Sequence, residues 1–364
     1  MCSRASVGIA VLLLAACREE TSVRIGAAGN WREAYGIMAK RGIDLATEEV
    51  NARGGVAGRT LSVVALDDSS DGSRAVQVAS QFLADPEILG VVGHIESDPM
   101  VAAARVYDRG LAAVSSTATA PALSGMSPWV FRVISSDSVN GRDIANHARR
   151  MGLVRAAVLY ENSSYGRGLA SAFARHFGGV VVSRDPIASD STSDLEPNLT
   201  YARLRRPDVV FVAGTAASGI GVLREAKRQG LQAAFIGGDG WSGVVAAGPL
   251  AEDVIVATPF SAEDPRDDVQ RFAMSFRRRY GAEPDANAAL AYDATHLLAR
   301  AIDEAGASRT AIRSWLGERV GEGAFRGVTG SIQFTPSGDV VGKGFVMTRV
   351  RGGTLHVEAG GRGR

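Results

Sequence analysis

An excess of charge of one sign is missing from this sequence, which carries 40 Lys and Arg against 39 Asp and Glu among 364 residues. The formal net charge is only +1, and no basic run is interleaved with aromatic residues. This excludes the electrostatic surface that nucleic-acid binding requires. Charged residues make up 22% and hydrophobic residues 46%, as in an ordinary globular protein, and the length favours two domains over one.

The apolar run at the N-terminus is too short to cross a bilayer. Val7–Ala16 has ten residues, whereas a spanning helix needs about 20. The run follows the positive Arg4 and ends in Leu14-Ala15-Ala16-Cys17, a small-residue cleavage pattern that resembles the bacterial lipobox. The resemblance implies a signal peptide at 1–16, lipidation of Cys17, a tether at 17–22, and a periplasmic or cell-surface protein held to the membrane only by its lipid. A buried first helix is the alternative.

Cysteine is scarce, with Cys2 and Cys17 the only two. Cys2 would be lost with the signal peptide, so the mature chain would keep Cys17 alone. This excludes an intramolecular disulfide and any zinc or redox site built on cysteines. A chain of this length can bury a core large enough to be stable without such links.

The signatures of common enzymes are also missing. The sequence has no Gly-x-x-x-x-Gly-Lys-Ser/Thr loop, no His-Glu-x-x-His and no Gly-x-Ser-x-Gly. Gly219-Ile220-Gly221 lacks the third glycine of a dinucleotide fingerprint, and we interpret it as helix packing. The histidines are scattered, so each is predicted to be a surface or capping residue: His94, His147, His176, His296 and His356. We therefore expect no enzyme, no metal site and no cofactor.

Short β-branched runs that alternate with helical stretches are abundant. A first series of strands is predicted at 23–26, 61–66, 89–93 and 111–115, and a second at 156–160, 180–182, 209–212 and 234–237. A helical pattern returns over 265–320, before strands at 331–334 and 345–347 and a Gly/Arg tail that we expect to be disordered. The alternation predicts an α/β fold with parallel sheets covered on both faces, in two series of domain size.

Polar residues follow several of these strands, at the sheet edge where open α/β sheets bind ligands. Residues 93–97 and 115–121 offer hydroxyls and helix-start amides, which suit a carboxylate. Asp239 follows a strand of the second series and suits an ammonium group. The alternative is that the hydroxyls only cap helices and that Asp239 is solvated.

Several segments, in this order, resemble the leucine/isoleucine/valine-binding family of type I periplasmic binding proteins. They are Tyr35 with 42–59, Asp67-Asp68, Gly93-His94, 116–123, 160–168 and 237–240, and the similarity covers nearly all of 23–350. The resemblance implies two Rossmann-like, doubly wound lobes joined by a hinge of three crossings. Lobe 1 is expected at 23–138 and 262–330, lobe 2 at 139–261 and 331–357, and a disordered tail at 358–364.

The same resemblance implies roles for individual residues. Ser97 and Thr119 match donors to a ligand carboxylate, while Thr117, through its carbonyl, and Asp239 match acceptors for an ammonium group. Tyr35 and Tyr165 match positions that line the ligand. The sequence departs from the family at Glu96, which replaces a half-cystine, and at Thr215, which stands with Ala216 where an aromatic is common. Trp241 is a further divergent wall position, and Glu96 would favour a polar or cationic ligand.

The resulting expectation is a monomeric solute-binding lipoprotein that captures an amino acid or related carboxylate or amide by hinge closure. Its expected partners are the permease and ATPase of an ABC importer. The ligand stays open among branched amino acids, amides, urea and aromatic acids, which related folds bind. A sensor lipoprotein without an importer and a structural envelope lipoprotein are alternatives. An extracellular hydrolase is disfavoured because no nucleophile with a placed base is evident.

Overall fold

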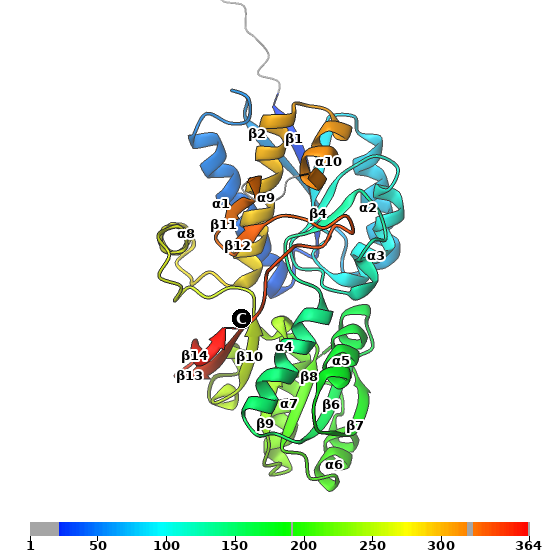
Figure 1. Ribbon diagram of the computed structural model, residues 1–364, viewed down its shortest axis with the longest axis vertical. Coiled ribbons are helices and arrows are strands. Elements are labelled where there is room, and N and C mark those ends of the chain that lie inside the picture. Colours follow the sequence, from blue (N-terminus) through cyan, green and yellow to red (C-terminus); the bar gives the residue numbers. More distant parts are fainter. Residues whose placement is uncertain (1–21, 191, 319–322, 363–364) are drawn as a thin grey trace, which may run out of the picture.

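The computed structural model describes residues 22–190, 192–318 and 323–362, and the predicted signal peptide and Cys17 lie outside these ranges. It has two lobes, one above the other in Figure 1, each built on its own sheet. Lobe 1 holds a parallel five-stranded sheet in the order β2-β1-β3-β4-β5. Its strands are β1 Val23–Gly29, β2 Leu61–Asp67, β3 Ile88–Val92, β4 Ala113–Ser115 and β5 Val130–Arg132.

Helices cover both faces of the lobe 1 sheet, as the alternating pattern predicted. Val92 packs in the core cluster that includes α1 and α9, whereas its neighbour Val91 packs against α2 and α3. Because adjacent residues of β3 point to opposite faces of the sheet and both faces are buried, the strand must be apolar throughout. This explains the continuous hydrophobic run in its sequence. The covering helices are α1 Ala34–Ala52, α2 Gly72–Ala84, α3 Ser97–Tyr107, α9 Ala286–Ala305 and α10 Arg309–Glu318, and α8 Asp267–Tyr280 packs outside them against α1 and α9.

Lobe 2 is built on a seven-stranded sheet in the order β14-β13-β10-β9-β8-β6-β7. Its strands are β6 Arg155–Glu161, β7 Val180–Ile187, β8 Val209–Ala213, β9 Ala234–Gly237, β10 Ile255–Thr258, β13 Val346–Arg351 and β14 Thr354–Arg362. The sheet lies between α4 and α5 on one face and α6 and α7 on the other. These helices are α4 Asp137–Arg150, α5 Ser164–His176, α6 Glu196–Leu204 and α7 Ala216–Arg228.

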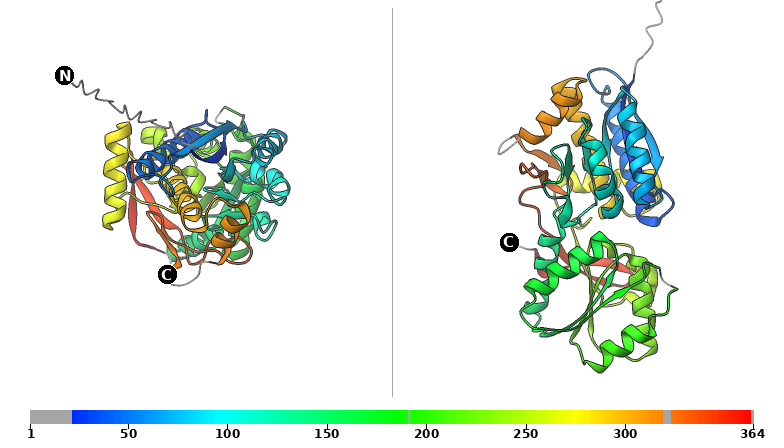
Figure 2. Two further views of the ribbon diagram at one scale, coloured as in Figure 1. Left: turned by 90° about the horizontal axis from the view of Figure 1, so that it is seen from above. Right: turned by 90° about the vertical axis from the view of Figure 1, so that its right-hand side faces the viewer.

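Three segments join the lobes, between β5 and α4, between β10 and α8, and between β12 and β13 (Figures 1 and 2). The expected boundary at 330/331 falls too early. Strand β12 (Gly330–Ile332) pairs with β11 (Phe325–Gly327) in a hairpin that is bound to lobe 1, because Asp293 of α9 accepts hydrogen bonds from the amides of Val328 and Thr329. The third crossing therefore follows Ile332.

The expected disordered tail is wrong for most of its length. Strand β14 continues to Arg362 and pairs antiparallel with β13, with Val346 opposite Arg362. The pattern of Gly and Arg side chains indicated disorder, but backbone pairing to a neighbouring strand needs no apolar side chain. Strands β5, β10 and β11, of three or four residues each, were also not predicted.

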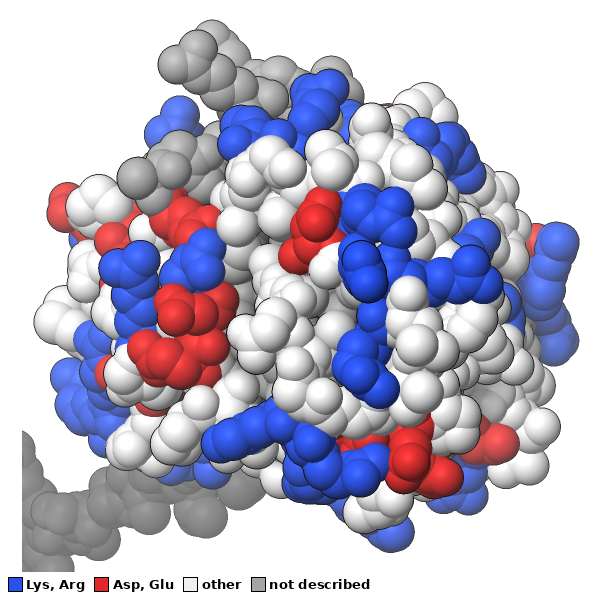
Figure 3. Space-filling model, turned by 90° about the horizontal axis from the view of Figure 1, so that it is seen from below, with Lys and Arg blue, Asp and Glu red and all other residues white. Residues whose placement is uncertain are grey.

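The surface of the described residues has no dominant charge on the face drawn in Figure 3. Basic and acidic side chains are interspersed there with uncharged ones, in agreement with the near-zero net charge. Ion pairs occur on the surface, as where Arg228 contacts Glu196 and Glu225. None of the helices in the described parts of the chain combines the length and hydropathy of a membrane span.

Candidate functional site

The turn after β3 sets the position of the first candidate residues. Gly93 has φ +123°, and a Cβ there would lie 2.2 Å from the carbonyl oxygen of Ala28, so the close approach of β3 to β1 requires glycine. The chain then reaches Glu96, which stands at the N-cap of α3, and Ser97, its first residue.

His94, in the same turn, is buried, which corrects the expectation of a surface or capping residue. Its Nδ1 is 2.6 Å from Asp68 Oδ2 and its Nε2 is 3.1 Å from the Tyr107 hydroxyl. Its carbonyl accepts a hydrogen bond from the Ser115 hydroxyl. A histidine with both ring nitrogens and its carbonyl engaged fixes the turn between β3 and α3, and ties it to β4, so His94 has a structural role.

Ser97 ties the loop after β4 to the start of α3. Its Oγ accepts hydrogen bonds from the amides of Thr119 and Ala120, at 3.2 and 3.1 Å. The hydroxyl proton of Ser97 therefore stays available as a donor. The Thr119 Oγ1 is buried without a hydrogen-bond partner in the described structure, and Thr117 donates its hydroxyl proton to the carbonyl of Ile95.

Asp239 follows β9 in lobe 2 and is held by two side chains. Its Oδ1 accepts hydrogen bonds from Asn140 Nδ2 at 2.7 Å and from the Tyr165 hydroxyl at 3.0 Å, and that hydroxyl accepts one from the amide of Gly240. Burial raises the pKa of Asp239 to about 6, although these hydrogen bonds lower it. The carboxyl group is thus fixed in orientation and poised to be ionised near neutral pH.

Asp137 is a candidate site residue that the sequence did not indicate. It is the first residue of α4, where the chain first crosses between lobes, and its amide donates to the carbonyl of Thr119 at 2.9 Å. The side chain is 0% exposed, and neither carboxyl oxygen has a hydrogen-bond partner among the described residues. Burial, and next the charge of Asp239, raise the pKa of Asp137 well above its usual value.

The two lobes touch beside these residues. Asp98, on the first turn of α3, accepts a hydrogen bond at 2.9 Å from the amide of Ser164 at the start of α5. Gly168 on α5 lies against Pro121, and a Cβ at Gly168 would be 2.7 Å from the proline ring. The start of α5, which carries Tyr165, is therefore brought to the loops that carry Ser97 and Thr119.

Glu96 and Tyr35 form a second polar pair in lobe 1. The Tyr35 hydroxyl donates to Glu96 Oε1 at 2.6 Å and is 3.2 Å from the hydroxyl of Ser70, while Glu96 Oε2 is buried without a described partner. Burial raises the pKa of Glu96, and the charges of Asp68 and Glu161 raise it further. Since Glu161 ends β6 of lobe 2, acidic groups of the two lobes lie near one another.

Thr215 and Trp241, the divergent positions of lobe 2, have different environments. Thr215 donates from its amide and its hydroxyl to Glu161 Oε1, each at 2.7 Å, and so belongs to this acidic region. Trp241 is wrong as a wall residue, because it is 0% exposed in the core of lobe 2. Its ring occupies the space left by Gly219 and Gly237, where Cβ atoms would lie 2.5 and 2.1 Å from it. This confirms the packing interpretation of Gly219.

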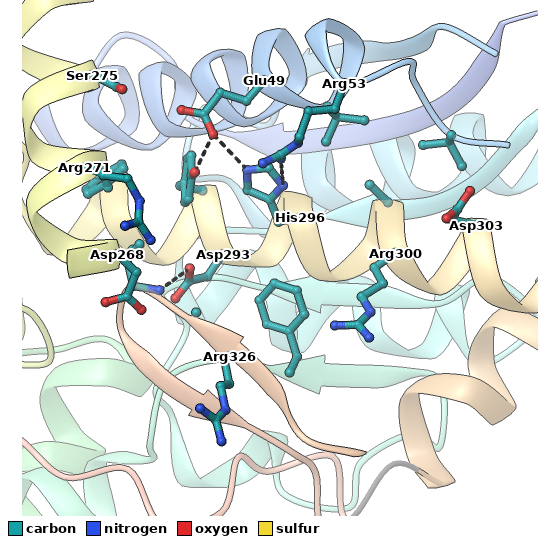
Figure 4. Close-up of a pocket in the computed structure, with 18 of the residues that line it drawn as sticks. Glu49, Arg53, Asp268, Arg271, Ser275, Asp293, His296, Arg300, Asp303 and Arg326 are labelled. Atoms are coloured by element: carbon teal, nitrogen blue, oxygen red, sulfur yellow. Dashed lines mark hydrogen bonds and ion pairs between the residues drawn. The ribbon is translucent and has the colours of Figure 1, made fainter. Parts of the chain in front are cut away.

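A cavity of about 630 Å³ lies elsewhere, within lobe 1 between α1, α8, α9 and the β11–β12 hairpin. Figure 4 shows Glu49 and His296 in contact at one end, with Arg271, Arg300 and Arg326 around the space. It contains none of the candidate residues. No group of three or more His, Cys, Asp or Glu placed to hold a metal ion occurs in the parts of the chain that are described.

Comparison with known proteins finds similar proteins over most of the length of this chain. Residues 23–354 match the family model described as periplasmic binding protein. The Leu/Ile/Val-binding protein homolog 1 of Brucella abortus (strain 2308) is 28% identical over 324 residues, 86% of this chain and 85% of the relative. The leucine-, isoleucine-, valine-, threonine-, and alanine-binding protein of Pseudomonas aeruginosa is 30% identical over 316 residues, 84% of this chain and 83% of the relative.

Solved structures are similar over the same extent. An ABC transporter substrate-binding protein from Desulfitobacterium hafniense in complex with Leu has a TM-score of 0.82 and 30% identity, and the match covers 93% of this chain and 100% of that one. The branched-chain amino acid transporter substrate binding protein LivJ from Streptococcus pneumoniae, in complex with isoleucine, has a TM-score of 0.86 and 26% identity, with 93% and 98% covered.

Proposed function

Because the chain belongs to the leucine/isoleucine/valine-binding family of periplasmic binding proteins, we propose that it captures an amino acid or amino-acid-like molecule between its lobes. The observation that carries the proposal is the approach of unlike groups from the two lobes. Ser97 and the loop of Thr119 come from lobe 1, Asp239 and Tyr165 come from lobe 2, and Asp137 connects them at the first crossing.

The ligand carboxylate would lie at the start of α3. The free hydroxyl proton of Ser97 and the unpartnered hydroxyl of Thr119 are donors there, and the positive end of the helix favours an anion. The ammonium group would lie at the Asp239 carboxylate, with the carbonyl of Thr117 as a second acceptor. Each ligand end would thus be bound mainly by a different lobe.

Such a division couples binding to hinge closure. A ligand that contacts both lobes favours the closed form, since the open form offers only half of the contacts. The hydrogen bond from Ser164 to Asp98 would add to the closed form without touching the ligand. The closed shape would be presented to the permease and ATPase of an ABC importer by a monomeric, non-enzymatic lipoprotein anchored through Cys17.

A thermal-shift screen with L-amino acids and small carboxylates tests the proposal. Ligand present at 100 times its dissociation constant stabilises the native state by about 2.7 kcal/mol, so at least one amino acid is expected to raise the melting temperature clearly. Calorimetry on the hits then gives the affinity. The proposal fails if no amino acid or small carboxylate in the panel shifts the transition of the folded protein.

A further inference from the structure

Four carboxyl groups gather where the lobes meet. Glu96 comes from lobe 1, Asp137 from the first crossing, and Glu161 and Asp239 from lobe 2. The elements that carry them are in contact, because Asp98, two residues after Glu96, accepts a hydrogen bond from the amide of Ser164, three residues after Glu161, and Tyr165 beside it donates to Asp239. The charge of Glu161 raises the pKa of Glu96, and the charge of Asp239 raises the pKa of Asp137. Two of the four, Asp239 and Glu161, accept hydrogen bonds from neutral groups of lobe 2.

No Lys or Arg within the described ranges forms an ion pair with any of these four groups. Arg132 is the cation whose charge acts on Asp137, but its guanidinium is engaged by Asp339, by the carbonyl of Ala120 and by the hydroxyl of Ser124. The meeting point of the lobes therefore has more acidic than basic groups, and burial raises the pKa of Glu96 and Asp137 among them, because no described cation is paired with either.

Buried acceptors without donors lie at two separate places in this region. Both oxygens of the fully buried Asp137, and Oδ1 of Asn140, lack a partner in the described structure beside Asp239. Glu96 Oε2 lacks one on the other side, where the hydroxyl of Tyr35, itself 3.2 Å from the hydroxyl of Ser70, donates to the other carboxyl oxygen, Oε1. Buried polar groups in native proteins nearly always have partners, so each place can accept a hydrogen bond from a donor on a ligand.

An α-ammonium group at Asp239 can serve the first place but not the second. A neutral zwitterion adds a carboxylate for its single ammonium, so it would leave the acidic excess unchanged and Glu96 unmatched. We infer that the ligand is an amino acid with a basic side chain, whose ammonium or guanidinium group binds Glu96. This inference rests on the proposed function.

A structural role for Glu96 is the competing explanation. An acidic residue at a helix start is stabilised by the helix dipole, and Glu96 stands at the N-cap of α3. However, its side chain makes no capping hydrogen bond to the helix amides, and burial is the largest cause of its raised pKa. A residue kept for the dipole would gain most from reaching those amides, which Glu96 does not do.

Calorimetry with L-lysine, L-arginine and L-norleucine tests the inference, because norleucine keeps the aliphatic chain of lysine but lacks its terminal nitrogen. Wild-type protein is expected to bind lysine or arginine at least about tenfold more tightly than norleucine, as befits a charge-assisted hydrogen bond. In Glu96→Gln this ratio should fall at least about tenfold, while norleucine affinity changes by less than about threefold. The melting temperature of ligand-free Glu96→Gln should not fall, since a neutral amide replaces a desolvated acid.

Glu87→Gln is the matched control, an exposed lobe 1 acid paired with Arg24, and should leave the ratio unchanged. Norleucine or leucine binding as tightly as lysine and arginine to wild-type protein would overturn the inference and leave the proposed function standing. An equal loss for all ligands in Glu96→Gln, with a lower melting temperature, would assign Glu96 a structural role and also overturn it. If calorimetry detected no binding of any amino acid, the proposed function itself would be overturned.

Discussion

Alanine at position 239 is expected to weaken the binding of an amino-acid ligand at least tenfold. A hydrogen bond to a charged group contributes about 1.5–3 kcal/mol, and about 1.4 kcal/mol corresponds to a factor of ten in affinity. Asp239 is held in place by Asn140 and Tyr165, so its removal deletes an acceptor whose orientation is fixed. Isothermal titration calorimetry measures the change, and an unchanged affinity would remove Asp239 from the site.

The pH dependence of the same affinity is the control for this assignment. Burial raises the pKa of Asp239 to about 6, and an ammonium group binds only its ionised form well. Affinity should therefore fall as the pH drops through 6, because part of the binding free energy is then spent on removing the proton. Asp239→Asn should show a shallower dependence, with Asp137 as the remaining acid beside Arg132 and Tyr165.

Replacing Trp241 with alanine is expected to destabilise lobe 2 by about 3–5 kcal/mol, the usual cost of removing a large buried aromatic ring. The indole fills space that Gly219 and Gly237 leave free, so the cavity cannot close by a small movement of side chains. Denaturant unfolding followed by circular dichroism measures the loss. Affinity for the ligand should stay close to wild type under conditions where the variant is folded.

Tyr201→Ala provides the comparison within lobe 2, because this aromatic ring is 42% exposed. Its effect should be within about 0.5 kcal/mol, as for most surface substitutions. An effect equally small for Trp241→Ala, combined with a loss of ligand affinity, would return Trp241 to the ligand wall and contradict its placement in the core.

Much of the fold could be predicted because buried strands such as β3 and β8 must be apolar on both faces, which leaves continuous hydrophobic runs in the sequence. The pairing of β14 could not, because a run of Gly and Arg has no apolar alternation that would indicate a strand, although its backbone pairs with β13. The third crossing was placed too early because the order of elements says nothing of the hydrogen bonds between Asp293 and the β11–β12 hairpin.

The candidate site was predictable where residue type and strand ends agree, as at Ser97, Thr119 and Asp239. Asp137 was missed because Ser136-Asp137 is an ordinary helix start, and only the packing of two lobes reveals that its carboxyl group is buried. Trp241 was misplaced for the opposite reason. It follows a strand end, as ligand-binding residues do, but the space left by Gly219 of α7 and Gly237 of β9 lets its ring pack in the core.

Crystals grown with the tightest-binding amino acid provide the most direct test of where the ligand is held. The ligand carboxylate is predicted within about 3 Å of the Ser97 hydroxyl, and its ammonium group within about 3 Å of the Asp239 carboxylate, with both lobes in contact with it. Electron density for the amino acid in the lobe 1 cavity of Figure 4, or on the outer surface of either lobe, would contradict the assignment.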